Sequence, residues 1–216
     1  KVVSVDSFAP VTLVAVLPHI LVVPRSVPAN SVKELIALAK AAPKKYTYAS
    51  AGIGSPIHLG GALFASMTGV DLVHVPYKGA SEYTTAVLGA HVTMTFGSVP
   101  TALPHIRSGV LRGLAATTAA RIKVLPELPT LAESGLAGYE MSSWYGLFAP
   151  AATSREIIAK INADANAVLG RADIRERFTE QGAEVVGGTP EQLAAFVRRE
   201  TALYAKVIKS SGIKID

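Results

Sequence analysis

Apolar residues along the chain follow two different spacings, and the alternation between them predicts alternating strands and helices. Continuous or β-prone apolar runs predict strands at residues 11–16, 20–23, 46–49, 72–76, 92–96 and 114–117. Helical spacing predicts intervening helices at about residues 31–42, 56–67, 81–88 and 100–109. Pro18-His19 separates the first two runs, so we expect two strands there. This order of elements favours a mainly parallel sheet with right-handed crossovers.

The C-terminal part of the chain has a different pattern. A proline- and glycine-rich excursion at 121–138, with a short helix expected near 131–134, leads to a strand at 145–148. Three helices are then predicted, the first capped by Thr153 and Glu156, the second at 173–181 and the third beginning at Thr189. Because only residues 185–186 resemble a strand between these helices, we expect a second domain.

The turn at residues 50–55 joins a predicted strand to a predicted helix and is built from small residues. Ser50, Gly52, Gly54 and Ser55 lie where the first N–H groups of a helix lack intrahelical partners, and Pro56 suits the first helical position. Glycine allows a ligand to approach the backbone, and the helix dipole favours negative charge. The turn therefore predicts an anion site for a carboxylate or a phosphate. A turn in which Ser55 only caps the helix is the alternative.

Two further loops have the same composition and begin where strands end. They lie at residues 77–80 and 97–100, and each opens a predicted helix. In open α/β sheets, ligands bind beyond the carboxyl ends of the strands. We therefore expect N–H donors from all three loops to converge on one anion, which favours a binding site over a simple cap.

Other functional classes lack their signatures. The turn has no third glycine of a dinucleotide fingerprint, no Walker lysine and no G-x-S-x-G elbow. Cysteine is absent and the histidines lack the close spacing of metal ligands, so we expect neither a cofactor nor a metal. The three-residue spacing of Ser55 and His58 leaves a serine hydrolase as the alternative function, although no third residue to orient the histidine is evident.

Composition indicates a folded protein with a mildly basic surface. Hydrophobic residues make up 50% of the chain and charged residues 17%, while the longest apolar run is too short to cross a bilayer. The 21 Lys and Arg residues exceed the 16 Asp and Glu residues, which gives a formal net charge of +5. Because the basic residues are scattered and not interleaved with aromatic residues, we expect attraction of small anions rather than binding of nucleic acid.

Longer motifs, taken in order, resemble one protein family. They are GIGSPIHL at 52–59, HVPYKGA at 74–80, LPHIRSGVLRGLA at 103–115, LPELPTLAESGLAGYE at 125–140, SWYGLFAPAATS at 143–154 and QGAEVVGGTPEQ at 181–192. Together they resemble the TctC/Bug family of periplasmic solute receptors of tripartite tricarboxylate transporters. The resemblance implies a type II periplasmic-binding-protein fold, with two α/β domains around a ligand cleft. It also implies non-catalytic capture of a small carboxylate in the periplasm, with the membrane permease subunits as partners.

The resemblance further implies a domain division and a set of ligand contacts. Domain 2 would comprise residues 20–144, and domain 1 would comprise residues 1–19 and 145–216. Members normally begin with a strand and a proline- and glycine-rich loop, so we expect domain 1 to be incomplete and the chain alone to bind carboxylates poorly and self-associate. Gly97 stands where members often have an acidic or amide residue. The implied ligand contacts are Ser50, Gly52, Gly54, Ser55, His58, Tyr77, Lys78, Gly79, Ala80, Gly97 and Ser98.

Three of these side chains also have a purely structural interpretation. His58 could equally be a helix-surface or core histidine. Tyr77 at a strand end could serve packing, and Lys78 could simply be solvated.

Overall fold

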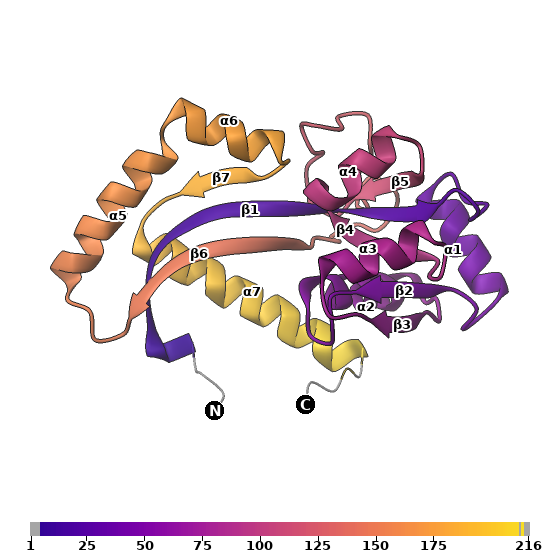
Figure 1. Ribbon diagram of the computed structural model, residues 1–216. Helices are drawn as coiled ribbons and strands as arrows, with labels where there is room; N and C mark the ends of the chain where they lie inside the picture. The colour runs from indigo at the N-terminus through magenta and orange to yellow at the C-terminus, as the bar shows by residue number, and fades with distance from the viewer. Residues whose placement is uncertain (1–4, 212, 214–216) are drawn as a thin grey trace. The chain divides into compact units, whose positions relative to one another are not determined.

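The computed structural model describes residues 5–211 and 213, and its contacts divide the chain into two compact units (Figure 1). Unit 1 consists of Lys1–Leu17 and Ser143–Tyr204, and unit 2 consists of Pro18–Ser142 and Ala205–Asp216. One long strand, β1 (Phe8–Pro24), contributes residues to both units.

The continuity of β1 corrects the expectation of two strands interrupted at Pro18-His19. The observed pairing of β1 with β7 (Glu184–Gly187) ends at Val16, and its pairing with β4 (Met94–Ser98) begins at His19. Pro18, which has no N–H to donate, therefore lies between the two sets of partners. A proline at this position interrupts no ladder in either pairing, so the backbone stays extended through it.

Unit 2 is built on a mixed sheet with the strand order β3-β2-β4-β1-β5. Strand β2 (Thr47–Ser50) runs parallel to both β3 (Val73–Pro76) and β4, whereas β1 runs antiparallel to β4 and to β5 (Leu111–Ala116). The expected mainly parallel sheet is thus wrong for β1. A continuous apolar run reports that a strand is buried on both faces, but it carries no information on strand direction.

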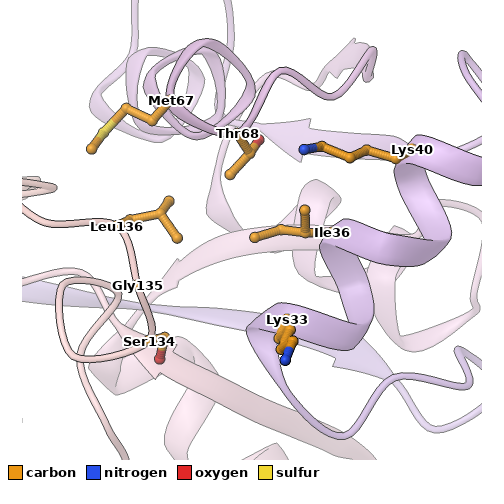
Figure 2. A pocket seen from close by; sticks show the side chains of 8 residues that line it. All are labelled: Lys33, Ile36, Lys40, Met67, Thr68, Ser134, Gly135 and Leu136. Atoms are coloured by element: carbon orange, nitrogen blue, oxygen red, sulfur yellow. The ribbon is translucent and has the colours of Figure 1, made fainter.

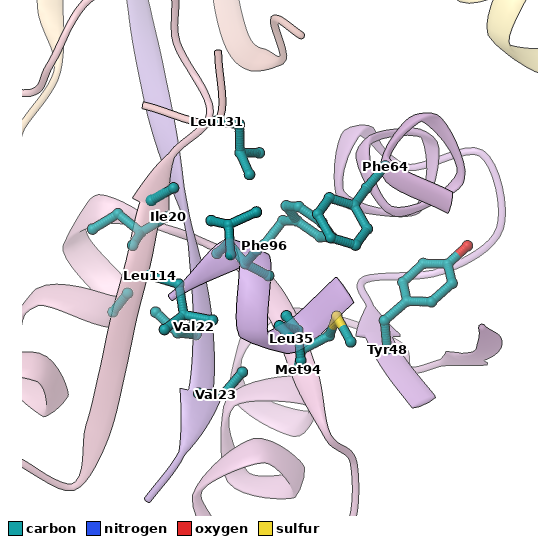
Figure 3. Packing of buried hydrophobic residues seen from close by; sticks show 14 of the residues in the cluster. Ile20, Val22, Val23, Leu35, Tyr48, Phe64, Met94, Phe96, Leu114 and Leu131 are labelled. Carbon is teal, nitrogen blue, oxygen red and sulfur yellow. The ribbon is translucent and has the colours of Figure 1, made fainter. Parts of the chain in front are cut away.

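The helices of unit 2 are α1 (Val32–Ala41), α2 (Pro56–Thr68), α3 (Ala80–Leu88) and α4 (Val99–Arg107). The last three pack on the sheet and enclose its core. Figure 3 shows Phe64 of α2 beside Phe96 of β4; both rings are fully buried, with centroids 5.9 Å apart. Burial of each such side chain stabilises the fold by about 1.5–3 kcal/mol. This packing fixes the position of α2, and therefore of the turn that precedes it in the sequence.

Residues 131–135 form hydrogen-bonded turns instead of the expected short helix. The Ser134 N–H donates to the Thr130 carbonyl, and the Glu133 carboxylate accepts from the Thr130 N–H. Gly135 follows with a φ of 106°. The segment is therefore capped at its start, and the backbone leaves the helical conformation at Gly135 after about one helical turn, so no helix continues.

Unit 1 combines β1 residues with β6 (Ser142–Pro150) and β7, which both pair with β1, and it includes the 3₁₀ turn Val5–Ser7. Its helices are α5 (Arg155–Leu169), α6 (Ala172–Glu180) and the part of α7 (Pro190–Ser211) up to Tyr204. The cap of α5 is Ser154, one residue later than expected, because its hydroxyl accepts from the Ile157 N–H. Among the described residues, every helix is too short or too polar to cross a membrane.

Candidate functional site

Three parallel strands of unit 2 end at the same edge of the sheet. β2 lies between β3 and β4, with Ser50 opposite Pro76 and Ala49 opposite Thr95. Each of these strands leads into a helix, so the starts of α2, α3 and α4 all follow this edge (Figure 1). Because helix starts carry unpaired N–H groups and the positive end of the dipole, the topology concentrates anion-binding groups there. We call the edge, with residues 50–58, 77–82 and 97–101, the loop edge.

The turn at 50–55 is held in shape by its own serines and glycines. Gly52 and Gly54 have φ values of 121° and 78°, which side chains with a Cβ rarely adopt. The Ser50 hydroxyl accepts from the Gly52 N–H at 3.1 Å, and the Ser55 hydroxyl donates to the Gly52 carbonyl at 2.7 Å. Ser55 also caps α2, because its hydroxyl accepts from the His58 N–H at 3.3 Å. Both serines thus act within the turn.

The ring of His58 contacts the same turn from behind. Its Nδ1 accepts a hydrogen bond from the Gly54 N–H at 3.0 Å. The ring stacks on His74 with a centroid distance of 3.9 Å and an interplanar angle of 12°. The Tyr48 ring lies against His74 at 4.9 Å, tilted by 30°. His74 Nε2 lies 2.6 Å from the Ser50 hydroxyl oxygen. The two histidines and Tyr48, which we call the histidine stack, therefore connect to both ends of the turn.

Burial keeps the histidine stack neutral at neutral pH. It lowers the pKa of His58, and burial together with repulsion from His58 lowers the pKa of His74 to about 4. Burial likewise raises the pKa of the Tyr48 hydroxyl. Neither His74 nor Tyr48 was predicted from the sequence as part of the site. Their pairing in the register of β2 and β3 is a tertiary feature, because it depends on which strands become neighbours.

Three N–H groups of the first loop stay unpaired among the described residues. The N–H groups of Gly52, Gly54 and Ser55 bond within the turn, whereas those of Ala51, Ile53 and Ile57 donate to no described group. The exposed Ile53 side chain, 59% accessible, shows that this part of the turn reaches the surface. These unpaired donors at a helix start can bind an anion.

The second loop supplies a helix start without a side-chain cap. Gly79 precedes α3 and caps it with no side chain, and Ala80 is the first helical residue. The Tyr77 N–H donates to the Ser50 carbonyl at 3.0 Å, which ties this loop to the first. The exposed Lys78 has its N–H bonded to the Glu82 carboxylate at 3.1 Å. That carboxylate sits in the first turn of α3 and opposes an incoming anion there.

The third predicted loop is shorter than expected, because β4 extends through Ser98 and α4 begins at Val99. Gly97 therefore lies inside the strand and is buried, with the Ala102 Cβ 3.4 Å from where its own Cβ would stand. The Ser98 hydroxyl lies 2.9 Å from that of Thr101, and Thr101 donates to the Ser98 carbonyl. Ser98 therefore lies at the loop edge directly before α4, and Gly97 precedes it inside β4.

The geometry of Ser55 and His58 does not match a nucleophile and its base. The Ser55 proton goes to the Gly52 carbonyl, and His58 Nδ1 accepts from Gly54, so the contact between the two residues is the backbone cap. Among the described residues, no cluster of three or more His, Cys, Asp or Glu side chains could hold a metal ion.

A separate pocket of about 230 Å³ lies at the far end of α2 (Figure 2). It is lined by Lys33, Ile36 and Lys40 of α1, by Met67 and Thr68 of α2, and by residues 134–136. It shares no residue with the loop edge.

Comparison with known proteins gives the class of the fold. R. palustris Rpa4515 with adipate is 38% identical with a TM-score of 0.89, over 96% of this chain and 69% of that one. MatC (Rpa3494) from Rhodopseudomonas palustris with bound malate is 29% identical with a TM-score of 0.84, over 94% of this chain and 70% of that one. The expected α/β fold of the periplasmic binding proteins is thus confirmed.

The family follows from a match over residues 2–213 to the Tripartite tricarboxylate transporter family receptor, TctC. The UPF0065 protein in the tcbD-tcbE intergenic region of a Pseudomonas species is 38% identical over 202 residues, which are 93% of this chain and 60% of that protein. The chain belongs to the TctC family, whose members are solute receptors, and the resemblance expected from its motifs is confirmed. It spans about 60% of the length of this relative.

Proposed function

We propose that this chain forms the carboxylate-binding part of a periplasmic solute receptor that serves a tripartite tricarboxylate transporter. Membership of the TctC family is the observation that carries the proposal, and two relatives were solved with adipate and with malate. Both ligands are small dicarboxylates. The proposed partners are the membrane permease subunits, and the proposed role is capture without catalysis.

The loop edge supports this proposal because it offers donors of the kind that carboxylates accept. The unpaired N–H groups of Ala51 and Ile53 lie in the turn before α2, and that of Ile57 lies in its first turn. The start of α3 adds the N–H groups of Gly79 and Ala80, against which the Glu82 carboxylate acts. Hydrogen bonds to an ionised acceptor are roughly twice as strong as neutral ones. A carboxylate head therefore gains both bonds and dipole interaction here, whereas a neutral amide gains only the bonds.

The contacts proposed for individual residues follow from this arrangement. Ser50, Gly52, Gly54 and Ser55 shape the turn, and His58 holds it from behind. The remaining contacts are proposed at Tyr77, Lys78, Gly79, Ala80, Gly97 and Ser98. Gly97 is buried inside β4, so its proposed contribution is made by the backbone directly before Ser98.

The test is an NMR titration that follows individual backbone N–H groups and so detects weak binding. The ¹⁵N-labelled chain is titrated with adipate and malate, and in parallel with adipamide and malamide. We expect saturable shifts at Ala51, Ile53 and Ile57 with the acids, and much weaker binding of the amides.

The start of α5 serves as the internal control, because it is a helix start of the same kind in the other unit, capped by Ser154. A general salt effect would shift the Arg155 and Glu156 amides as strongly as those of the loop edge. Equal responses at both helix starts, or equal affinity for acid and amide, would contradict the proposal.

A further inference from the structure

The hydrogen bond that the Gly54 N–H donates depends on the protonation state of the His58 side chain. This N–H donates to His58 Nδ1 at 3.0 Å, so this ring nitrogen must carry a lone pair and no proton. The neutral ring then has its proton on Nε2. A protonated ring would place an N–H donor against the Gly54 N–H donor, and the hydrogen bond would be lost.

The surroundings of His58 favour the neutral ring that this bond requires. The ring is buried, 6% exposed, and stacks on His74 of β3 at 3.9 Å, with Tyr48 of β2 at 6.3 Å. These two aromatic groups are the titratable side chains in observed ring contact with it, and neither supplies a negative charge near neutral pH. A cationic His58 would be desolvated and would stand directly against a second histidine.

His74 acts on the other end of the turn. Its Nε2 lies 2.6 Å from the Ser50 hydroxyl oxygen, and that oxygen accepts from the Gly52 N–H. The Gly52 carbonyl already accepts from both the hydroxyl and the N–H of Ser55. The Ser50 hydroxyl has two acceptors within reach, the Gly52 carbonyl at 3.0 Å and His74 Nε2 at 2.6 Å. The shorter contact favours donation to His74, and each of the two stacked histidines then accepts one hydrogen bond from the turn.

We propose that His58, backed by His74, is a positioning residue that holds the turn at 50–55 in its anion-binding shape by accepting the Gly54 N–H. The inference deepens the proposed function and rests on it for the identity of the ligand. With Gly54 bonded inward at a φ of 78°, the flanking N–H groups of Ile53 and Ile57 remain unpaired. His58 thus acts through the backbone instead of touching the carboxylate with Nδ1.

Two substitutions separate the acceptor from the bulk of the ring. His58→Asn places an amide oxygen near the position of Nδ1, so it can still accept from Gly54, and it cannot titrate. His58→Leu fills space but offers no acceptor. We expect His58→Leu to bind adipate about fivefold to tenfold more weakly than wild type, the effect of one hydrogen bond, and His58→Asn to recover most of that loss.

A ligand-free readout makes the inference testable independently of the proposed function. In the wild-type chain, the ¹⁵N shift of His58 Nδ1 should be that of an unprotonated nitrogen at pH 7.5. The Gly54 amide shift should change as the pH falls and His58 becomes protonated. In His58→Asn, which retains His74, the Gly54 amide should be nearly insensitive to pH over the same range. In His58→Leu, this amide should exchange with solvent faster than in wild type.

The outcomes divide cleanly. A protonated Nδ1 at pH 7.5, or a Gly54 amide that titrates equally in His58→Asn, would overturn the inference, as would adipate affinity unchanged in His58→Leu. If Gly54 behaves as stated but neither adipate nor malate binds, the positioning of the turn stands and the proposed function fails. If His58→Leu does not fold, the wild-type titration and the Asn variant still decide.

Discussion

Replacing Ser55 by alanine removes two hydrogen bonds that act in different ways. The first is the cap, in which the hydroxyl accepts from the His58 N–H at 3.3 Å. The second is the bond that the hydroxyl donates to the Gly52 carbonyl at 2.7 Å. Loss of an N-cap typically costs about 1 kcal/mol. The second bond adds less than a full hydrogen bond, because the Gly52 carbonyl still accepts from the Ser55 N–H.

We therefore expect Ser55→Ala to lower the free energy of unfolding by about 1–2 kcal/mol, measured by urea denaturation. The matched control is Ser31→Ala, because Ser31 caps α1 in the same unit by accepting from the Glu34 N–H at 3.2 Å. It lies outside the loop edge. Its cost should be about 1 kcal/mol, the value of the cap alone.

Binding separates the two variants. Without its bond to Gly52 the turn loses a constraint, so Ser55→Ala should bind adipate more weakly than Ser31→Ala despite their similar stability. Calorimetric titration of both variants measures the difference. Equal affinities would remove the Ser55 hydroxyl from the binding site and refute the argument that the turn must be held in one shape.

Two further predictions concern stability. Gly52→Ala should lower the free energy of unfolding by about 1–3 kcal/mol, because the φ of Gly52 is 121°. Gly97→Ala should change it little, because the new Cβ would meet the Ala102 Cβ at an ordinary 3.4 Å. Urea midpoints that fall equally in the two variants would contradict this. Burial lowers the pKa of His19 to about 4, although its Nδ1 donates to the Phe96 carbonyl at 2.9 Å, so the folded state keeps this ring neutral. As the pH falls, His19 is protonated in the unfolded chain before it is protonated in the folded chain. The free energy of unfolding is therefore at its full value above about pH 6.5 and decreases as the pH falls towards 4, by about 2 kcal/mol at pH 5. Denaturation at pH 7.5 and pH 5 measures the loss, and a His19→Gln variant should lose less over that interval.

Local features of this protein were readable from its sequence. The turn of small residues before Pro56, the cap by Ser55 and the helix that follows all occur where they were predicted. The cap of α1 is equally local, because the Ser31 hydroxyl accepts from the Glu34 N–H three residues later. These features involve residues within four positions of each other, so their geometry follows from backbone sterics and short hydrogen bonds that no distant segment changes.

Features that depend on distant segments were decided only by the tertiary structure. The antiparallel course of β1 was missed, since burial on both faces looks the same for either strand direction. The extension of β4 to Ser98, which places Gly97 inside a strand, was missed for a related reason: a neighbouring strand, β1, pairs with both residues.

The histidine stack is the clearest case at the candidate site. From the sequence, His58 had several possible roles and His74 had none. The pairing of β2 with β3 sets Tyr48 opposite His74, and the start of α2 brings the His58 ring onto that of His74. A side chain takes its protonation state and its hydrogen-bonding role from the groups packed around it. For both histidines, those groups come from segments that only folding makes neighbours.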